Sequence, residues 1–262
     1  MKLSALSGKI IMKNLLYIVL LTTQVFFAQN SFENGNALYQ KGKYQEAITA
    51  YESVLQQHKH SSELYFNMAN CYYKLNKVAP ALFHYEKALL LDPENESIKN
   101  NLKFAQKLQI DDIKTVPKVG FYKLIQGVTG TYHYNAWGWI AVSLSVLFLR
   151  LFVGYYFSQI TWSKRLFFVG MLVVVLFFGL SVGSALFEKN RYQAEQPAIV
   201  YAEVVSVKGE PKENAPDAFI LHEGTKVNLL EKLGPWAKIQ LTDQTEGWLE
   251  IKNIRLVKEE IQ

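Results

Sequence analysis

The sequence predicts a multidomain membrane protein in which a region of all-α helical repeats, two transmembrane helices and a small all-β barrel follow one another over 262 residues. Three observations predict this order. Matching positions recur 34 residues apart before residue 110, two long apolar blocks occupy the middle of the chain, and short runs of β-branched and aromatic residues alternate with turn residues after position 198.

The first 28 residues have the pattern of a secretory signal peptide. Two lysines precede a short apolar run at residues 15–21, and Ala28 is a small residue followed by a polar one. We expect cleavage after Ala28. An uncleaved N-terminal anchor is the alternative, because Phe26 stands where a small residue is usual. The pattern is complete from Met12, so the start lies at Met1 or at Met12.

Residues 30–110 contain two copies of one repeat. Ala47 and Tyr51 are matched by Ala81 and Tyr85, 34 residues further on in both cases. The period and the small and aromatic positions resemble the tetratricopeptide repeat, which implies two helices in each repeat. A capping helix that covers the open face of the second repeat is predicted by the apolar residues Ile98, Leu102, Ala105 and Leu108.

Stacked repeats of this kind present a concave groove that binds peptides or protein segments, and the resemblance implies such a groove here. The family's geometry places eight side chains in or beside it, namely Phe32, Asn36, Tyr39, Phe66, Asn67, Asn70, Tyr73 and Asn101. The asparagines are similar to those of peptide-carboxylate clamps, but the lysines of such clamps are missing. We therefore favour a protein-binding groove of unspecified preference over a specific carboxylate clamp.

Two apolar blocks predict a transmembrane hairpin. Residues 166–187 hold no charged residue and are long enough to cross a hydrocarbon core of about 30 Å at about 1.5 Å per residue. Residues 135–157 are equally apolar apart from Arg150, which we expect to reach the nearer membrane face or to pair. The residues between the spans, 158–165, are too few for a domain and form a loop.

Two crossings return a chain to its starting side, so the domains before and after the hairpin must share a compartment. The signal peptide places both outside the cytoplasm and makes residues 158–165 a cytoplasmic loop. We expect residues 111–134 to be a linker or an interfacial helix and residues 188–197 to be a second linker. For the G-x-x-x-G pattern of Gly179 and Gly183, we favour packing within the hairpin over dimerisation.

Residues 198–258 change to the period of β-strands. Turn residues separate four apolar runs, at 199–207, 226–230, 236–241 and 247–249, which predicts a small β-barrel. The order of three segments, Glu223-Gly224-Thr225, Gly234-Pro235-Trp236-Ala237-Lys238-Ile239 and Glu246-Gly247-Trp248-Leu249, resembles a bacterial SH3-like domain, and that resemblance implies peptidoglycan or peptide recognition. Trp236 and Trp248 are the ligand candidates, although we favour half-buried core positions for both.

The ionisable residues argue against several functions. Residues 30–115 hold ten basic and ten acidic residues, and residues 198–262 hold eight and eleven, so neither domain is basic enough to predict a nucleic acid partner. We recognise no paired catalytic carboxylates, nucleophile triad, phosphate loop or metal cluster, and expect neither an enzyme nor a cofactor. Cys71 is expected to be a buried packing residue.

The order of all these segments resembles the BatE-type proteins of the Bacteroides aerotolerance operon, and the resemblance covers nearly all of the mature chain. It implies a protein of the bacterial inner membrane with periplasmic N- and C-terminal domains. It also implies work with von Willebrand factor A domain membrane proteins and a MoxR-type ATPase, in oxidative-stress tolerance or envelope maintenance.

The function favoured by these patterns is that of a non-enzymatic, membrane-anchored scaffold or adaptor. It would hold protein partners in the groove of its helical repeats, within an aerotolerance or envelope-stress complex. The alternative is a cell-wall sensor that binds peptidoglycan fragments through the SH3-like domain. A lytic enzyme that uses this domain for targeting would need a catalytic constellation, which we do not recognise.

Overall fold

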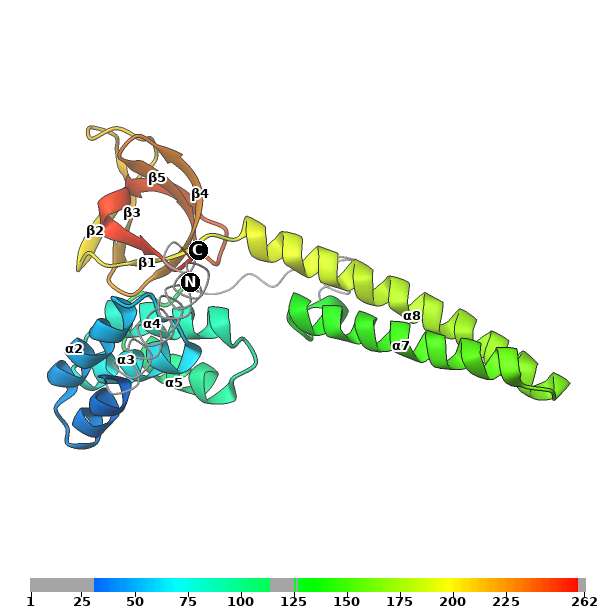
Figure 1. The fold of residues 1–262 in the computed structure, drawn as a ribbon. Helices are drawn as coiled ribbons and strands as arrows, with labels where there is room; N and C mark the ends of the chain where they lie inside the picture. Colours follow the sequence, from blue (N-terminus) through cyan, green and yellow to red (C-terminus); the bar gives the residue numbers. More distant parts are fainter. Residues whose placement is uncertain (1–30, 114–124, 126, 259–262) are drawn as a thin grey trace, which may run out of the picture. The chain divides into compact units, whose positions relative to one another are not determined.

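A computed structural model of the chain describes residues 31–113, 125 and 127–258 (Figure 1). The predicted signal peptide and half of the predicted linker or interfacial helix, residues 111–134, lie outside these residues. The chain divides into two compact units. The first combines residues up to Asp112 with Pro197–Leu241 and those from Thr245 onward, and the second is formed mainly by Ile113–Gln196.

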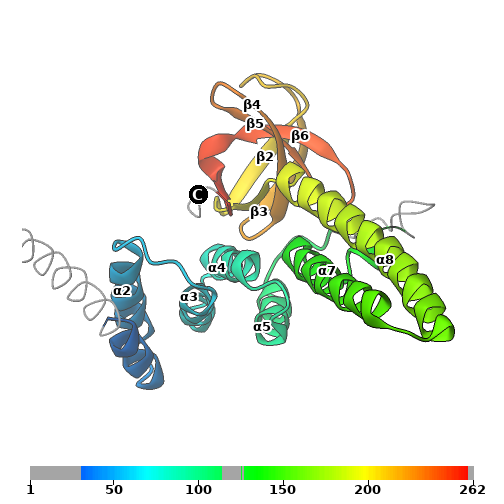
Figure 2. The same cartoon turned by 45° about the vertical axis from the view of Figure 1, so that its right-hand side comes forward.

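The helical part of the first unit, which we call the repeat domain, has the five helices expected from the sequence. Residues 31–40 are helical, and four helices follow in a row (Figure 2): α2 (Tyr44–Leu55), α3 (Ser62–Lys74), α4 (Val78–Leu91) and α5 (Glu96–Gln106). A hydroxyl and an amide side chain cap the N-termini of two of these helices. Ser61 accepts a hydrogen bond from the backbone of Leu64 at α3, and Asn95 accepts from Ser97 and Ile98 at α5.

Small and aromatic residues meet between the repeat helices, as the repeat pattern predicts. A Cβ atom on Gly35 would collide with the ring of Tyr51, so the first repeat admits no side chain there. The matching position in the second repeat is Ala69, which is fully buried beside Tyr85. Cys71 is buried in the core around Tyr51, as expected.

The second unit is a hairpin of two long apolar helices, α7 (Tyr134–Phe157) and α8 (Thr161–Ala194). The α8 helix extends beyond the apolar block on both sides, so the connection shortens from the predicted residues 158–165 to residues 158–160. Apolarity sets the length of a span but not that of a helix. At the other end α8 runs on through an ion pair between Glu188 and Arg191, whose atoms are 2.6 Å apart.

The G-x-x-x-G prediction was wrong in its favoured form. An ideal Cβ on Gly179 or Gly183 would meet no atom within 4 Å, so this face of α8 is not packed against α7. Close approach occurs instead near the connection, where the Cβ position of Gly154 lies 3.0 Å from the ring of Phe167. The hairpin therefore uses a different glycine for its own packing.

The residues after the hairpin form a seven-stranded antiparallel sheet, which we call the β domain. Its spatial order is β3-β2-β6-β5-β4-β1-β7. The strands are β1 (Pro197–Val200), β2 (Val204–Lys208), β3 (Asp217–His222), β4 (Lys226–Leu233), β5 (Trp236–Gln240), β6 (Glu246–Glu250) and β7 (Ile254–Leu256). The run predicted at 199–207 is broken at residues 201–203 into two strands, and β3 and β7 lie outside the predicted runs.

Within the first unit, the repeat domain and the β domain share a small core. Ala79 and Phe83 of α4 pack with Ile199 of β1 and with Val257, all of them buried. Gly224 faces the same helix, because a Cβ there would lie 2.9 Å from Leu82 and 3.0 Å from Val78. Its φ of +86° is also one that side chains rarely adopt.

Polar contacts surround this shared core. The carboxylate of Asp111 accepts hydrogen bonds from the backbone N–H of His222 at 2.7 Å and from the Thr225 hydroxyl at 2.6 Å. Its other oxygen lies 2.7 Å from His222 Nδ1. Lys226 forms an ion pair of 2.7 Å with Glu86 of α4. The two domains, which the hairpin separates in sequence, are therefore packed and bonded as one body.

Candidate functional site

The groove side of the repeat domain carries the same hydrogen-bonded triplet twice. In the first repeat, Asn36 Oδ1 accepts from the Tyr51 hydroxyl at 2.6 Å and from Asn67 Nδ2 at 3.0 Å. In the second, Asn70 Oδ1 accepts from Tyr85 at 2.6 Å and from Asn101 Nδ2 at 2.9 Å. Each residue of the first triplet has its counterpart 34 residues later.

These bonds fix the direction of the two asparagine amides. An amide oxygen has two lone pairs, and Asn36 and Asn70 use both of them within the triplet. A flip of the amide would place its NH2 group against two donors, so the orientation is set by the network. Within residues 31–113 the Nδ2 atoms of Asn36 and Asn70 have no hydrogen-bond partner. Each amide therefore offers two N–H donors to a ligand.

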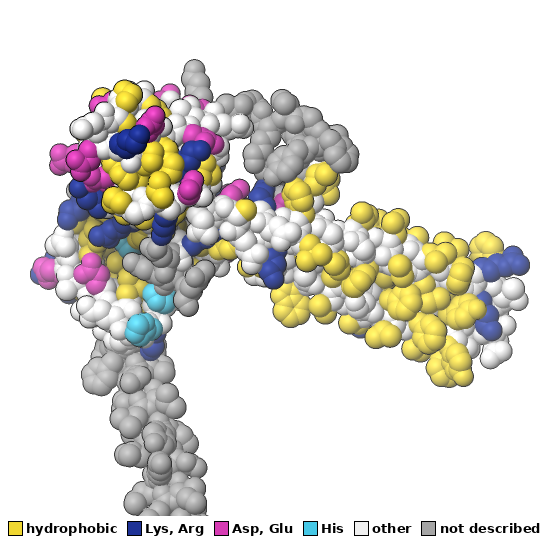
Figure 3. Space-filling model, turned by 90° about the horizontal axis from the view of Figure 1, so that it is seen from above, with side chains coloured by type: hydrophobic (Ala, Val, Ile, Leu, Met, Phe, Trp, Pro, Cys, Tyr) yellow, Lys and Arg dark blue, Asp and Glu magenta, His cyan; other side chains and the backbone are white. Residues whose placement is uncertain are grey.

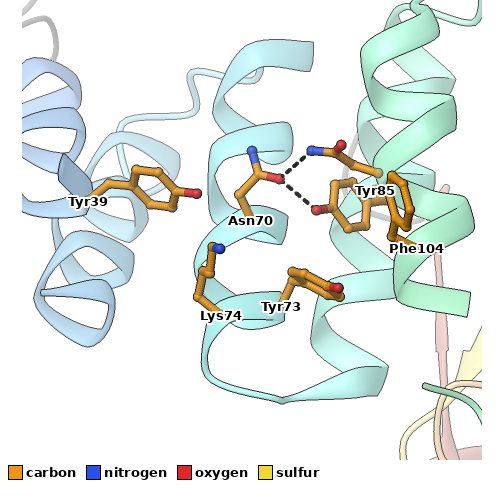
Figure 4. Close-up of a pocket in the computed structure, with 7 residues that line it drawn as sticks. Tyr39, Asn70, Tyr73, Lys74, Tyr85 and Phe104 are labelled. Carbon is orange, nitrogen blue, oxygen red and sulfur yellow. Dashed lines mark hydrogen bonds between the residues drawn. The ribbon is translucent and has the colours of Figure 1, made fainter. Parts of the chain in front are cut away.

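A pocket of about 230 Å³ opens beside the second triplet. Residues from four helices line it, as Figure 4 shows: Tyr39, Asn70, Tyr73, Lys74, Tyr85, Asn101 and Phe104. Asn70 lies at its centre, with Tyr39 on one side and Tyr85 and Phe104 on the other. The walls are thus largely aromatic, and Asn70 supplies a polar group between them.

The polar groups of the pocket are mainly donors. Burial and the neighbouring Tyr44 and Cys71 raise the pKa of the Tyr39 phenol, and burial raises that of Tyr85, so both hydroxyls keep their protons at neutral pH. Lys74 adds an exposed ammonium group. The lining residues include no carboxylate, histidine or thiol. This chemistry suits the binding of an acceptor group rather than proton transfer or nucleophilic attack.

Four of the eight groove residues predicted from the sequence line this pocket: Tyr39, Asn70, Tyr73 and Asn101. Asn36 and Asn67 belong to the first triplet. The two phenylalanines have a packing role instead. Phe32 lies against Tyr51 and Phe66 against Tyr85, with ring centroids 5.8 Å and 6.1 Å apart.

Sequence reasoning missed three lining residues, Lys74, Tyr85 and Phe104. Helical spacing could have found two of them, because Lys74 follows Asn70 by four residues and Phe104 follows Asn101 by three. From the sequence, Tyr85 was recognised only as the aromatic position of the repeat that matches Tyr51. The structure gives it both roles, since its ring is buried and its hydroxyl holds Asn70.

The tryptophans of the β domain lie on its outer face. Along β5 and β6 they alternate with buried residues such as Ala237 and Leu249, so they point away from the core. Trp248 is paired with Lys238 on one side and Lys208 on the other. Both tryptophans are half-buried, as expected, but they are not core residues.

Among the described residues, no group of three histidine, cysteine or acidic side chains could hold a metal ion. The buried thiol of Cys71 is also unsuited to chemistry, because burial raises its pKa to about 12. His84 is buried against the rings of Tyr65 and Tyr72, and burial lowers its pKa to about 3. Both side chains belong to the core of the repeat domain.

Comparison with known proteins identifies the repeat domain. Residues 38–103 match the family model of the tetratricopeptide repeat. Sperm-associated antigen 1 of Mus musculus is 36% identical over 75 residues, which are 29% of this chain and 8% of that protein. The Hsp70-Hsp90 organizing protein of Triticum aestivum is 35% identical over 66 residues, 25% of this chain and 11% of that protein.

A solved structure, the first TPR domain of the human RPAP3 protein, is 23% identical and covers 31% of this chain and 91% of its own, with a TM-score of 0.23. The chain spans only about a tenth of the length of the curated relatives that it matches. The family match covers residues 38–103, which lie within the repeat domain. The chain is therefore a protein with a tetratricopeptide repeat domain, joined to two long apolar helices and a seven-stranded antiparallel sheet.

Proposed function

We propose that this protein is a non-enzymatic, membrane-anchored scaffold whose repeat groove binds extended segments of partner proteins. The observation that carries the proposal is the pair of donor amides on Asn36 and Asn70, with an aromatic-walled pocket beside the second. Donor amides held in place can bond the backbone carbonyls of an extended segment whatever its sequence. The adjoining pocket can then select one side chain.

Membrane anchoring is supported by the surface of the hairpin. Its helices contain windows of mean hydropathy 1.9 and 2.6, of which 6% and 17% are buried. Figure 3 shows hydrophobic side chains along the hairpin, with lysine and arginine gathered at one end. An apolar surface of this extent needs a cover, and a lipid bilayer provides one.

The contact between the repeat domain and the β domain supports a topology with both on one side of the membrane. Because Asp111 bonds Thr225, the chain segments before and after the hairpin belong to one body. A body cannot be divided by a bilayer, so the intervening residues must cross an even number of times. With the expected signal peptide, this favours a bacterial inner-membrane protein whose two domains are periplasmic.

The resemblance in domain order to BatE-type proteins extends this proposal to particular partners. The scaffold would work with von Willebrand factor A domain membrane proteins and a MoxR-type ATPase in an aerotolerance or envelope-stress complex. The β domain would be an SH3-like module within it.

Photocrosslinking in native membranes tests the scaffold. The photoreactive amino acid p-benzoylphenylalanine replaces Phe104, which is 54% exposed at the pocket, or Leu233, which is 52% exposed on the β domain, as the control. We expect discrete protein adducts from position 104 that disappear when Tyr73→Ala and Lys74→Ala are added. Absence of adducts at position 104, or the same adducts at position 233, would contradict a partner-binding groove.

A second candidate, the cell-wall sensor, rests on the outward position of Trp248 between Lys208 and Lys238. A half-buried indole on the outer face of a sheet can stack on a sugar ring. The flanking lysines are already paired, Lys208 with Asp217 and Lys238 with Glu246, so the indole carries this candidate. Pull-down of the full chain by purified peptidoglycan, compared with Trp248→Ala, tests it. Equal recovery of both proteins, or of neither, would count against the sensor.

A further inference from the structure

The pocket beside Asn70 points to a definite ligand chemistry, and naming it rests on the proposed function of the groove. We infer that this pocket takes the carboxylate of an aspartate or glutamate side chain, carried by an extended acidic segment of the partner. The carboxylate would accept hydrogen bonds from Asn70 Nδ2 and pair with Lys74, while the tyrosine rings flank its methylene groups.

The first argument is the polarity of the pocket. The Asn70 amide cannot turn its oxygen inward without losing its bonds to Tyr85 and Asn101, so it presents donors only. Lys74 and the hydroxyls of Tyr39 and Tyr73 add further donors. A carboxylate accepts bonds and offers none when ionised, so it matches this set better than an amide or an ammonium group.

The second argument is charge. Lys43 and Lys99 of the repeat domain are neutralised by Glu46 and Glu96, at 2.9 Å and 3.0 Å. Within residues 31–113, Lys74 has no ion pair, and Lys107, whose Nζ lies 5.2 Å from the centre of the Phe104 ring, has none either. Two uncompensated cations at the pocket and its rim attract a negative segment.

The third argument is size and position. A volume of about 230 Å³ is below the range of roughly 300–1,000 Å³ typical of small-molecule sites, and it fits one side chain. Asn36 lies three residues before the pocket residue Tyr39 on the same helix, and its free Nδ2 can bond the backbone of the same segment. A segment that reaches both amides passes through the pocket, so we assign the carboxylate to a side chain and not to a chain end.

Peptide selection on the full-length protein in detergent micelles tests this inference. The probe is a random dodecapeptide library displayed inside a phage coat protein, so that no peptide has a free C-terminus. A second library with free C-termini is selected in parallel. One good charge-assisted contact predicts that an acidic residue is enriched roughly tenfold at one position of the internal library.

Two variants, each with a matched control, make the result specific. Lys74→Met should abolish the acidic enrichment, whereas Lys103→Met, at an exposed lysine of α5 that does not line the pocket, should leave it unchanged. Tyr85→Phe should weaken it by releasing the Asn70 amide. Tyr51→Phe removes the equivalent bond of the first repeat, where Asn36 contacts the peptide backbone, so it should lower the overall recovery of peptides but preserve the preference for an acidic residue.

The inference is overturned by any of three results: no acidic enrichment in the internal library, the same enrichment on Lys74→Met, or enrichment only where the peptides end freely. These outcomes differ from failure of the proposed function itself. In that case position 104 captures no partner in native membranes, whatever the libraries select.

Discussion

Truncation of Phe83 tests whether the repeat domain and the β domain unfold together. Phe83 is 3% exposed and belongs to the core shared with Ile199 and Val257. Its ring also meets that of Tyr201 edge-on, with centroids 5.7 Å apart. Removing a buried phenylalanine side chain costs about 3–5 kcal/mol. Phe83→Ala should therefore lower the free energy of unfolding of the joint body by at least about 3 kcal/mol.

Hydrogen exchange measured by mass spectrometry separates the domains in one experiment. A loss of about 3 kcal/mol accelerates exchange through the joint opening by roughly 150-fold. We expect this acceleration in peptides from α4 and equally in peptides from β1 and residues 222–226. Phe104→Ala is the control, because Phe104 is exposed and lies outside the shared core. It should leave the β domain unchanged.

The reasoning would be refuted by faster exchange in α4 with no change in β1. That pattern would mean that the two domains open independently and that their contact adds little to stability. The proposal for an even number of crossings would then lose its structural support.

Three further predictions concern single side chains. Burial opposes the charge on Asp111, but hydrogen bonds from Thr225 and His222 outweigh it and hold the pKa of Asp111 below its ordinary value of 3.8. The ionised Asp111 carboxylate therefore stabilises the folded state fully above pH 3.8, and this stabilisation is lost as the pH falls through the lowered pKa. Asp111→Asn should flatten the acid limb of a plot of Tm against pH. Thr129→Val removes a bond of 2.6 Å to Glu188, which is 4% exposed, and should cost the hairpin about 1–3 kcal/mol in detergent melts, unlike Ser143→Ala on the exposed face. Because burial raises the pKa of the Cys71 thiol to about 12, alkylation should be slow in the native chain and fast in denaturant; rapid native labelling would contradict the packing described.

Much of the repeat domain could be predicted because its information is local and periodic. The recurrence of Ala47 and Tyr51 at Ala81 and Tyr85 fixes two helix pairs, and the spacing of Ile98 and Leu102 fixes the capping helix. Leu108 was wrongly included, since α5 ends at Gln106 and leaves it exposed. The groove asparagines followed from the same period.

The sequence could not predict which way the amide groups of Asn36 and Asn70 point. That orientation depends on which side chains donate hydrogen bonds to the amide oxygens. Nothing in the sequence says that Tyr85 donates to Asn70, although helical spacing brings Lys74 to the same face. The outward position of Trp248 was missed for a related reason. Alternation along a strand separates two faces but does not identify the one that becomes the core.

The contact between the repeat domain and the β domain could not be predicted either, because the residues that form it are far apart in the sequence. Asp111 and Thr225 are 114 residues apart, and neither lies in a pattern that names its partner. The same holds for Gly224, whose glycine is explained only when Leu82 and Val78 are seen beside it. The patterns of a single sequence show local periodicity, and contacts between residues far apart in the chain leave no periodic pattern.

The hairpin itself lowers the cost of joining the two domains. As a flexible loop, the 84 residues of Ile113–Gln196 would cost roughly 4 kcal/mol of closure entropy. The bond between Thr129, which precedes α7, and Glu188, near the end of α8, brings the two ends of the hairpin together. The flexible loop that must be closed then consists only of residues 113–128 and 189–196. Because the closure entropy depends on the logarithm of loop length, the shorter loop lowers its cost by about 1 kcal/mol. Thr129→Val should therefore weaken the contact of Asp111 with Thr225 as well as the hairpin.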